Sequence, residues 1–148
     1  MIVDQDQLNL LKRNSLFNSV DQSFIDSFIK PKNFFTAKEG TLLYSCEDDS
    51  TEMYLIAEGE IKIKFCDQRN IEYRFLLDFF GEKEIMDKTK RVSFAIANKE
   101  CILYKISAEE INSLISSYEI ILNNLMKVIP EEQMEYAEPA FAQDEFSS

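Results

Sequence analysis

Histidine and tryptophan are missing from this 148-residue chain, and glycine, proline and cysteine occur only three times each. The lack of histidine excludes histidine-rich metal centres and serine or cysteine nucleophiles that a histidine activates. Catalysis would have to rest on carboxylates, lysine or tyrosine, and no arrangement of these side chains in the sequence suggests a reaction. We therefore predict that the chain is not an enzyme and that it has neither a metal site nor a cofactor.

Long apolar runs are also absent. No segment approaches the roughly 20 apolar residues that a membrane-spanning helix needs. The first six residues lack the basic start and the apolar core of a secretory signal peptide. We therefore expect a cytoplasmic protein that does not insert into a membrane.

The three cysteines, Cys46, Cys66 and Cys101, are odd in number and widely spaced, and each lies in an apolar stretch. Their spacing is not that of metal ligands. A free cysteine behaves as a small hydrophobic residue. We expect all three to be buried, reduced thiols.

Acidic residues dominate, with a formal net charge of −11 that argues against a nucleic-acid partner. The charge is uneven, because residues 131–148 contain acidic but no basic side chains and carry −6. We divide the chain into a folded domain, 1–129, and an acidic tail, 130–148, that we expect to be disordered. The tail is either inert and solvated or able to dock onto a basic, apolar groove of a partner.

Apolar spacing predicts helices at both ends of the domain and strands between them. A helix is expected at 5–14, and a second begins at the N-cap residue Asp21 and stops before Pro31. Short alternating segments between 33 and 106 predict many strands, as in a sandwich or barrel. Ser107 and Glu110 form a capping box before a helical stretch to residue 129, with a break near 116–117.

The segment Phe79-Phe80-Gly81-Glu82 and the later Arg91 are the most informative residues. Backbone N–H groups at a helix start lack intrahelical partners and can receive an anion. An arginine fork can bind the same phosphate, and a neighbouring carboxylate can accept from a sugar hydroxyl. These residue types together are suited to one phosphate and one sugar.

Four motifs in order make residues 10–129 resemble the cyclic nucleotide-binding domain family, the β-roll of catabolite-activator proteins and kinase regulatory subunits. They are an opening helical segment at 16–28, a glycine turn at 38–43, a hairpin at 53–63, and Phe80-Gly81-Glu82 with Arg91. The resemblance implies an α+β, mainly β fold: an eight-stranded, jelly-roll-like β-roll flanked by N-terminal and C-terminal helices.

The same resemblance implies roles for individual residues. Gly81 would let the backbone approach a cyclic phosphate, Glu82 would accept from the ribose 2′-hydroxyl, and Arg91 would pair with the phosphate. The backbone that follows Gly81 and the strand that follows Arg91 would complete the site. The expected ligand-binding residues are Gly81, Glu82, Lys83, Ile85, Arg91, Val92 and Ser93, and the ligand would be cyclic AMP or cyclic GMP.

Three departures from the family pattern favour a pocket that no longer binds. Glu84 stands where the family usually has a small residue, the loop before Asp78 is shortened, and Val92 replaces a hydroxyl or an alanine. Glu82 and Arg91 favour binding, since unpaired buried charge is costly, although the two could simply pair with each other. A cyclic-nucleotide sensor and a non-binding interaction or scaffold module therefore both stay open.

Both functions require a second protein to receive the signal, because no DNA-binding, kinase or channel segment is recognisable after residue 130. We expect a regulatory domain that signals to an unidentified protein effector through the C-terminal helix, the acidic tail or the N-terminal helices. A homodimer is a further possibility, since the apolar stripe from Ile111 to Ile129 is broad enough for both core and interface.

Overall fold

The structure is a computed structural model that describes residues 3–68, 70–126 and 133–136. Helical segments lie at both ends and between the strands: α1 (Gln5–Lys12), η1 (Ser15–Phe17), α2 (Gln22–Phe28), η2 (Pro31–Asn33), α3 (Glu82–Asp87), α4 (Ala108–Ser117) and α5 (Glu119–Leu125). The strands are β1 (Phe34–Ala37), β2 (Leu42–Tyr44), β3 (Glu52–Glu58), β4 (Ile61–Phe65), β5 (Asn70–Arg74), β6 (Phe79–Phe80), β7 (Ser93–Ala97), β8 (Cys101–Ser107) and β9 (Met134–Tyr136).

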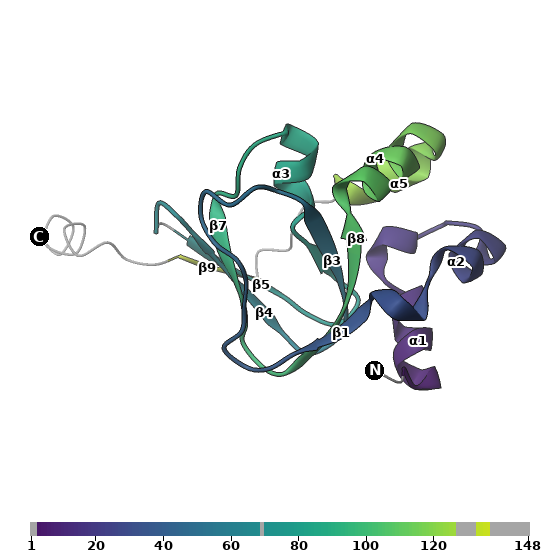
Figure 1. The fold of residues 1–148 in the computed structure, drawn as a ribbon, viewed down its shortest axis with the longest axis horizontal. Coiled ribbons are helices and arrows are strands. Elements are labelled where there is room, and N and C mark those ends of the chain that lie inside the picture. The colour runs from purple at the N-terminus through teal and green to yellow at the C-terminus, as the bar shows by residue number, and fades with distance from the viewer. Residues whose placement is uncertain (1–2, 69, 127–132, 137–148) are drawn as a thin grey trace, which may run out of the picture.

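The strands form two antiparallel sheets. One has the order β1-β8-β3-β6 and the other β2-β7-β4-β5-β9. The N-terminal helices and the α4–α5 pair lie beside the β1-β8-β3-β6 sheet, on the side away from β4 and β7 (Figure 1). Strands β1–β8 and the flanking helices confirm the predicted α+β, mainly β architecture, an eight-stranded β-roll with helices at both ends.

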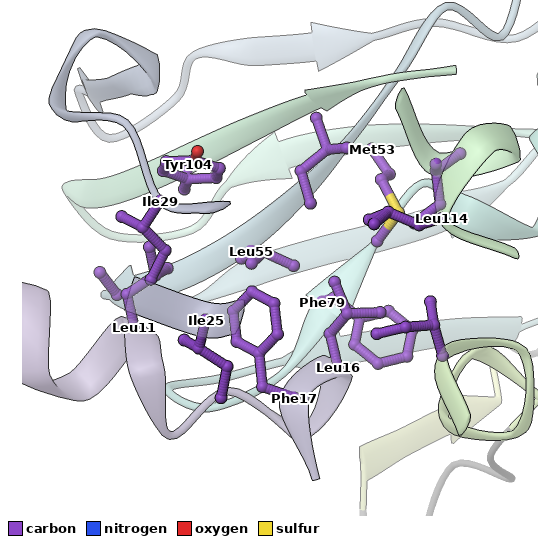
Figure 2. Packing of buried hydrophobic residues seen from close by; sticks show 14 of the residues in the cluster. Leu11, Leu16, Phe17, Ile25, Ile29, Met53, Leu55, Phe79, Tyr104 and Leu114 are labelled. Carbon is purple, nitrogen blue, oxygen red and sulfur yellow. The ribbon is translucent and has the colours of Figure 1, made fainter. Parts of the chain in front are cut away.

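Two apolar clusters hold these layers together. The first joins the helices to the β1-β8-β3-β6 sheet and includes Leu11, Leu16, Leu55 and Tyr104, which are at most 1% exposed (Figure 2). The second fills the space between the two sheets. β3 contributes to both clusters, because alternate side chains of a strand point to opposite faces. Its residues 53–57 are therefore all buried.

The predicted helix caps are present. Asp21 accepts a hydrogen bond from the Phe24 amide at the start of α2, and Ser107 and Glu110 form the reciprocal capping box of α4. The break expected near 116–117 falls at Tyr118, between α4 and α5. No helix in the described part of the chain is long and apolar enough to cross a membrane.

The prediction of three reduced cysteines is wrong for two of them. Cys46 and Cys66 form a disulfide with a Cα–Cα distance of 6.0 Å, and Cys66 is exposed. Their strands β2 and β4 flank β7 on either side, which brings the two residues together at the same end of the sheet. Sequence spacing carries no sign of this neighbourhood. Cys101 is free and buried, as predicted.

The expected disorder after residue 130 needs correction at four positions, 133–136. Residues 134–136 form β9, which pairs with the edge strand β5 in the register Asn70↔Tyr136. Just before it, the Gln133 side chain donates to the Tyr73 carbonyl at 2.9 Å. The sequence around these residues has no sustained apolar period. Backbone pairing with β5 therefore explains the strand better than its own composition does. The rest of the predicted tail, 130–132 and 137–148, lies outside the described residues.

Gly59, in the β3–β4 turn, is the glycine whose replacement we expect to cost most. Its φ is +102°, and an added Cβ would lie 2.6 Å from the Glu100 carbonyl oxygen. We predict that Gly59→Ala lowers the free energy of unfolding by about 2 kcal/mol, through backbone strain and overpacking. Gly40→Ala is the control, because Gly40 has a φ of +87° but no atom within 4 Å of the added Cβ. Urea unfolding would show equal losses for both variants if packing around Gly59 were unimportant.

Candidate ligand pocket

A cavity of about 390 Å³ lies where β6, α3 and the end of α5 meet the β2-β7-β4-β5-β9 sheet. Its walls combine aromatic and aliphatic side chains with several carboxylates. The lining residues are Tyr44, Ile63, Phe65, Glu72, Arg74, Phe80, Gly81, Glu82, Lys83, Glu84, Met86, Asp87, Ser93, Leu125 and Met126. A pocket of this size and composition is suited to a small organic molecule.

Gly81 forms the floor where β6 turns into α3. It is buried and has a φ of +85°, a left-handed conformation that only glycine adopts without strain. A Cβ at this position would lie 3.3 Å from the Glu52 carbonyl oxygen and 3.4 Å from Nη1 of Arg91. The glycine therefore allows α3 to approach both β3 and the arginine closely.

Arg91 lies beneath this turn with only 2% of its surface exposed. Its Nη1 donates to the Gly81 carbonyl at 2.7 Å and to Oε1 of Glu84 at 2.9 Å. Its Nη2 donates to the Glu52 carbonyl, and the guanidinium carbon stacks 3.9 Å from the centre of the Tyr44 ring. Nε is buried without a hydrogen-bond partner. The arginine is thus held by protein groups on several sides.

Glu84, and not Glu82, is the carboxylate that pairs with Arg91. The side chains of Glu84 and Arg91 are almost fully buried, at 7% and 2% exposure respectively. A buried pair of this kind offsets the cost of desolvating each charge only while both partners are present. Glu84 belongs to the cavity wall and Arg91 does not. The position that departed from the family pattern therefore carries the partner of the arginine.

Glu82 points its carboxyl at the same cavity in a different environment. Burial raises the pKa of the Glu82 carboxyl to about 7; the nearby Glu84 and Glu72 also raise it, while its own backbone N–H and Arg74 oppose the shift. Arg74 is itself paired with Glu72 at 2.7 Å. Glu82 is thus a carboxyl that stays partly protonated near neutral pH.

The aromatic wall is anchored by the arginine. Burial raises the pKa of the Tyr44 phenol, and the adjacent Arg91 cation opposes that shift only in part. The Tyr44 ring is tilted against Phe80 with 6.3 Å between ring centroids, and the Tyr54 ring stacks on Phe80 at 5.0 Å. Of these rings, Tyr44 and Phe80 line the cavity and form its aromatic wall.

The seven predicted ligand-binding residues fall into three groups. Gly81, Glu82, Lys83 and Ser93 line the cavity, whereas Arg91 and Ile85 are buried behind it, Ile85 in the core next to the helices. Val92 is 44% exposed, because it alternates with Arg91 along the strand direction and faces outward. The role of each residue toward a ligand stays a prediction.

Sequence reasoning did not place Tyr44, Glu72 and Arg74 at the site. Glu72 and Arg74 are two residues apart on β5 and therefore share a face, which was the one signal that could have linked them. Tyr44 ends β2 and carried no signal at all. Among the described residues, no group of three or more Cys, Asp or Glu side chains is placed to hold a metal ion.

Several solved structures share this fold at low sequence identity. The regulatory domain of Toxoplasma gondii PKA, solved with cAMP, aligns with a TM-score of 0.62, 21% identity, and coverage of 76% of this chain and 46% of that one. The Thermus thermophilus catabolite activator protein aligns with a TM-score of 0.62 and 19% identity, and the alignment covers 76% of this chain and 55% of that one. The N-terminal domain of a Streptomyces coelicolor transcriptional regulator aligns with a TM-score of 0.60 and 20% identity, and the alignment covers 79% of this chain and 86% of that one.

The match to whole proteins is partial. The chain spans less than two thirds of several solved chains that it matches, including two others at 57% and 58% of their length. No curated protein sequence matches it significantly. The family model for the cyclic nucleotide-binding domain matches residues 34–118, more than half of the chain. The β-roll, the glycine turn into α3 and this match together establish that the chain belongs to the cyclic nucleotide-binding domain family.

Proposed function

We propose that this chain is a regulatory domain in which the Glu84 carboxylate takes the place that a cyclic phosphate would occupy against Arg91. The domain then acts through contacts with a protein effector while its pocket is closed to cyclic nucleotides. The observation that carries this proposal is the buried Arg91–Glu84 pair, with 2.9 Å between Nη1 and Oε1.

The energetics of that pair favour the closed state. A phosphate that reached Arg91 would have to displace Glu84 and leave a buried carboxylate without its cation, at a cost of several kcal/mol. The remaining arginine contacts, to the Gly81 and Glu52 carbonyls, fix the guanidinium further. A cyclic nucleotide would therefore have to offset the loss of the pair before any net binding appeared.

The charge around the cavity points the same way. Glu72, Glu82, Glu84 and Asp87 contribute carboxylates, against the cations Arg74 and Lys83. Arg74 is already paired with Glu72, and Lys83 is exposed. A phosphate entering the cavity would meet more negative than positive charge, which disfavours an anion.

A sensor of cyclic AMP or cyclic GMP is the second candidate. The size and aromatic wall of the cavity and its Gly81, Glu82 and Ser93 lining support it, as does the cAMP named for the Toxoplasma regulatory domain. In this case the ligand would replace Glu84 at Arg91 and shift α3. The effector, in either case, would contact the acidic tail or the C-terminal helix, and a homodimer remains one form of such contact.

Glu84→Ala separates the two candidates. Removing the carboxylate leaves Arg91 without its internal partner and makes room for an anion. We expect no change in melting temperature for the natural chain with millimolar cyclic AMP or cyclic GMP. The Glu84→Ala variant should gain a few degrees, because a ligand at 100 times its Kd adds about 2.7 kcal/mol.

Asp87→Ala is the matched control, because it removes an exposed carboxylate from the same helix and the same cavity wall. It should behave like the natural chain. Glu84→Gln, which keeps the side-chain shape, serves if Glu84→Ala does not fold. A rise in melting temperature of the natural chain that Arg91→Ala abolishes would favour the sensor, and would refute the closed pocket.

A further inference from the structure

The disulfide joins the two loops that flank the segment carrying Arg91. Cys46 follows β2 and Cys66 follows β4, the two neighbours of β7 in the sheet. β7 begins at Ser93, so the cross-link spans the two residues that precede it, Arg91 and Val92. Arg91 points into the protein and Val92 is 44% exposed on the outer side.

Backbone hydrogen bonds join this segment to both cysteine-bearing loops. On one side, the Glu47 amide donates to the Arg91 carbonyl and the Arg91 amide donates to the Asp48 carbonyl, each at 2.9 Å. On the other side, the Cys66 amide donates to the Val92 carbonyl at 2.9 Å. The disulfide therefore closes a ring of contacts around the backbone of Arg91.

The loop after Cys46 also supplies contacts to the residues just before Arg91. The Ser50 hydroxyl donates to the Thr89 carbonyl at 2.7 Å, and Lys90 pairs with Asp49 at 2.9 Å. The same loop leads into β3, whose Glu52 carbonyl accepts from Nη2 of Arg91. Increased motion of this loop would therefore disturb both the backbone and the side-chain hydrogen bonds of Arg91.

We propose that the Cys46–Cys66 disulfide is a reversible redox switch that, when intact, fixes the backbone of Arg91 and keeps its side chain on Glu84, and that, when reduced, releases this segment. The part of this proposal that concerns the contact between Arg91 and Glu84 rests on the proposed function. A cross-link restricts the chain more than any single hydrogen bond of the ring, because it limits the open states of both loops at once.

The chemistry needs only a thiol reductant. A thiolate of a dithiol attacks one sulfur, which forms a mixed disulfide and releases the other cysteine as a thiol. The second thiol of the reductant then displaces the remaining cysteine, so that two electrons and two protons end on Cys46 and Cys66. Cys66 is exposed and offers the accessible end. In the cytoplasmic location that the sequence predicts, disulfides are typically transient or redox-sensing.

Amide hydrogen exchange of the full chain, oxidised with glutathione disulfide or reduced with dithiothreitol, tests the switch. We expect exchange at the amides of Glu47, Cys66 and Arg91 to become at least about tenfold faster on reduction. The Asn98 amide, which donates to the Glu60 carbonyl just beyond the far end of β7, should be unchanged. Cys66→Ser should exchange like the reduced chain in both buffers.

Cys101→Ser is the matched control, because it removes the free, buried thiol and should keep the full difference between the two buffers. Equal exchange in both states would refute the switch, and so would a non-reducing digest of the oxidised chain without a Cys46–Cys66 linked peptide. Cyclic AMP binding separates the two proposals. If Glu84→Ala binds no nucleotide while reduction still speeds exchange, the closed pocket fails and the switch stands.

Discussion

Arg91→Ala is expected to lower the free energy of unfolding by about 3–5 kcal/mol, the usual cost of leaving one partner of a buried ion pair alone. The change removes the partner of Glu84, two donors to the Gly81 and Glu52 carbonyls, and the cation over the Tyr44 ring. Urea unfolding followed by circular dichroism measures the loss as a lower midpoint with an unchanged slope.

Lys90→Ala is the control for a neighbouring cation. Lys90 pairs with Asp49 at the same 2.9 Å, but both side chains are more than half exposed, so we expect a loss below about 1 kcal/mol. A double-mutant cycle with Glu84→Leu and Arg91→Leu isolates the pair, because replacing both charges by apolar groups should cost less than the two single changes together. Additive losses would contradict a direct interaction.

The β-roll could be predicted from the sequence because local signals and family motifs agree with the final packing. The alternating Ile61, Ile63 and Phe65 lie on β4, and the caps at Asp21 and Ser107 start α2 and α4. Gly59 and Gly81 both have positive φ at turns. Such features depend on residues close in the chain, where spacing alone carries the information.

The features that were missed depend on which distant segments meet. The pairing of Arg91 with Glu84 rather than Glu82 is decided by how α3 packs, since both carboxylates line the cavity but only Glu84 lies within 2.9 Å of the guanidinium. Cys46 and Cys66 meet because the strands before them, β2 and β4, both pair antiparallel with β7 and therefore end on the same side of the sheet. β9 forms because the edge of β5 is available to it. No spacing in the sequence reports these neighbours.

These missed contacts change the functional expectation more than the fold. The sequence offered Arg91 as a free phosphate ligand, and the structure gives it an internal carboxylate, two carbonyls and an aromatic ring. Conversely, Glu82 was expected to accept from a ligand hydroxyl, and its own cation neighbour, Arg74, is already bound to Glu72. Among the described residues, Glu72 and Glu84 have cations paired with them and Glu82 has none, so its charge state depends on its burial.

Glu82→Gln is expected to raise stability at pH 8 by about 3 kcal/mol. The pKa of the Glu82 carboxyl rises from 4.5 to about 7 on folding, chiefly through burial, and each unit is worth about 1.4 kcal/mol. Because the folded-state pKa is the higher one, the folded chain binds this proton more tightly. The ionised carboxyl therefore opposes folding, increasingly as pH rises from about 4.5 to 7 and fully above that range.

Urea unfolding of both proteins between pH 4 and pH 8 measures this effect as a difference. The gap between Glu82→Gln and the natural chain should be near its minimum at pH 4 and should widen through pH 7, because the amide cannot ionise. Asp87→Asn, a change to an exposed carboxyl of the same helix, should show a nearly constant gap. If the Glu82→Gln gap were also constant with pH, Glu82 would titrate normally, and the cavity would be wetter and more open to anions than its geometry indicates.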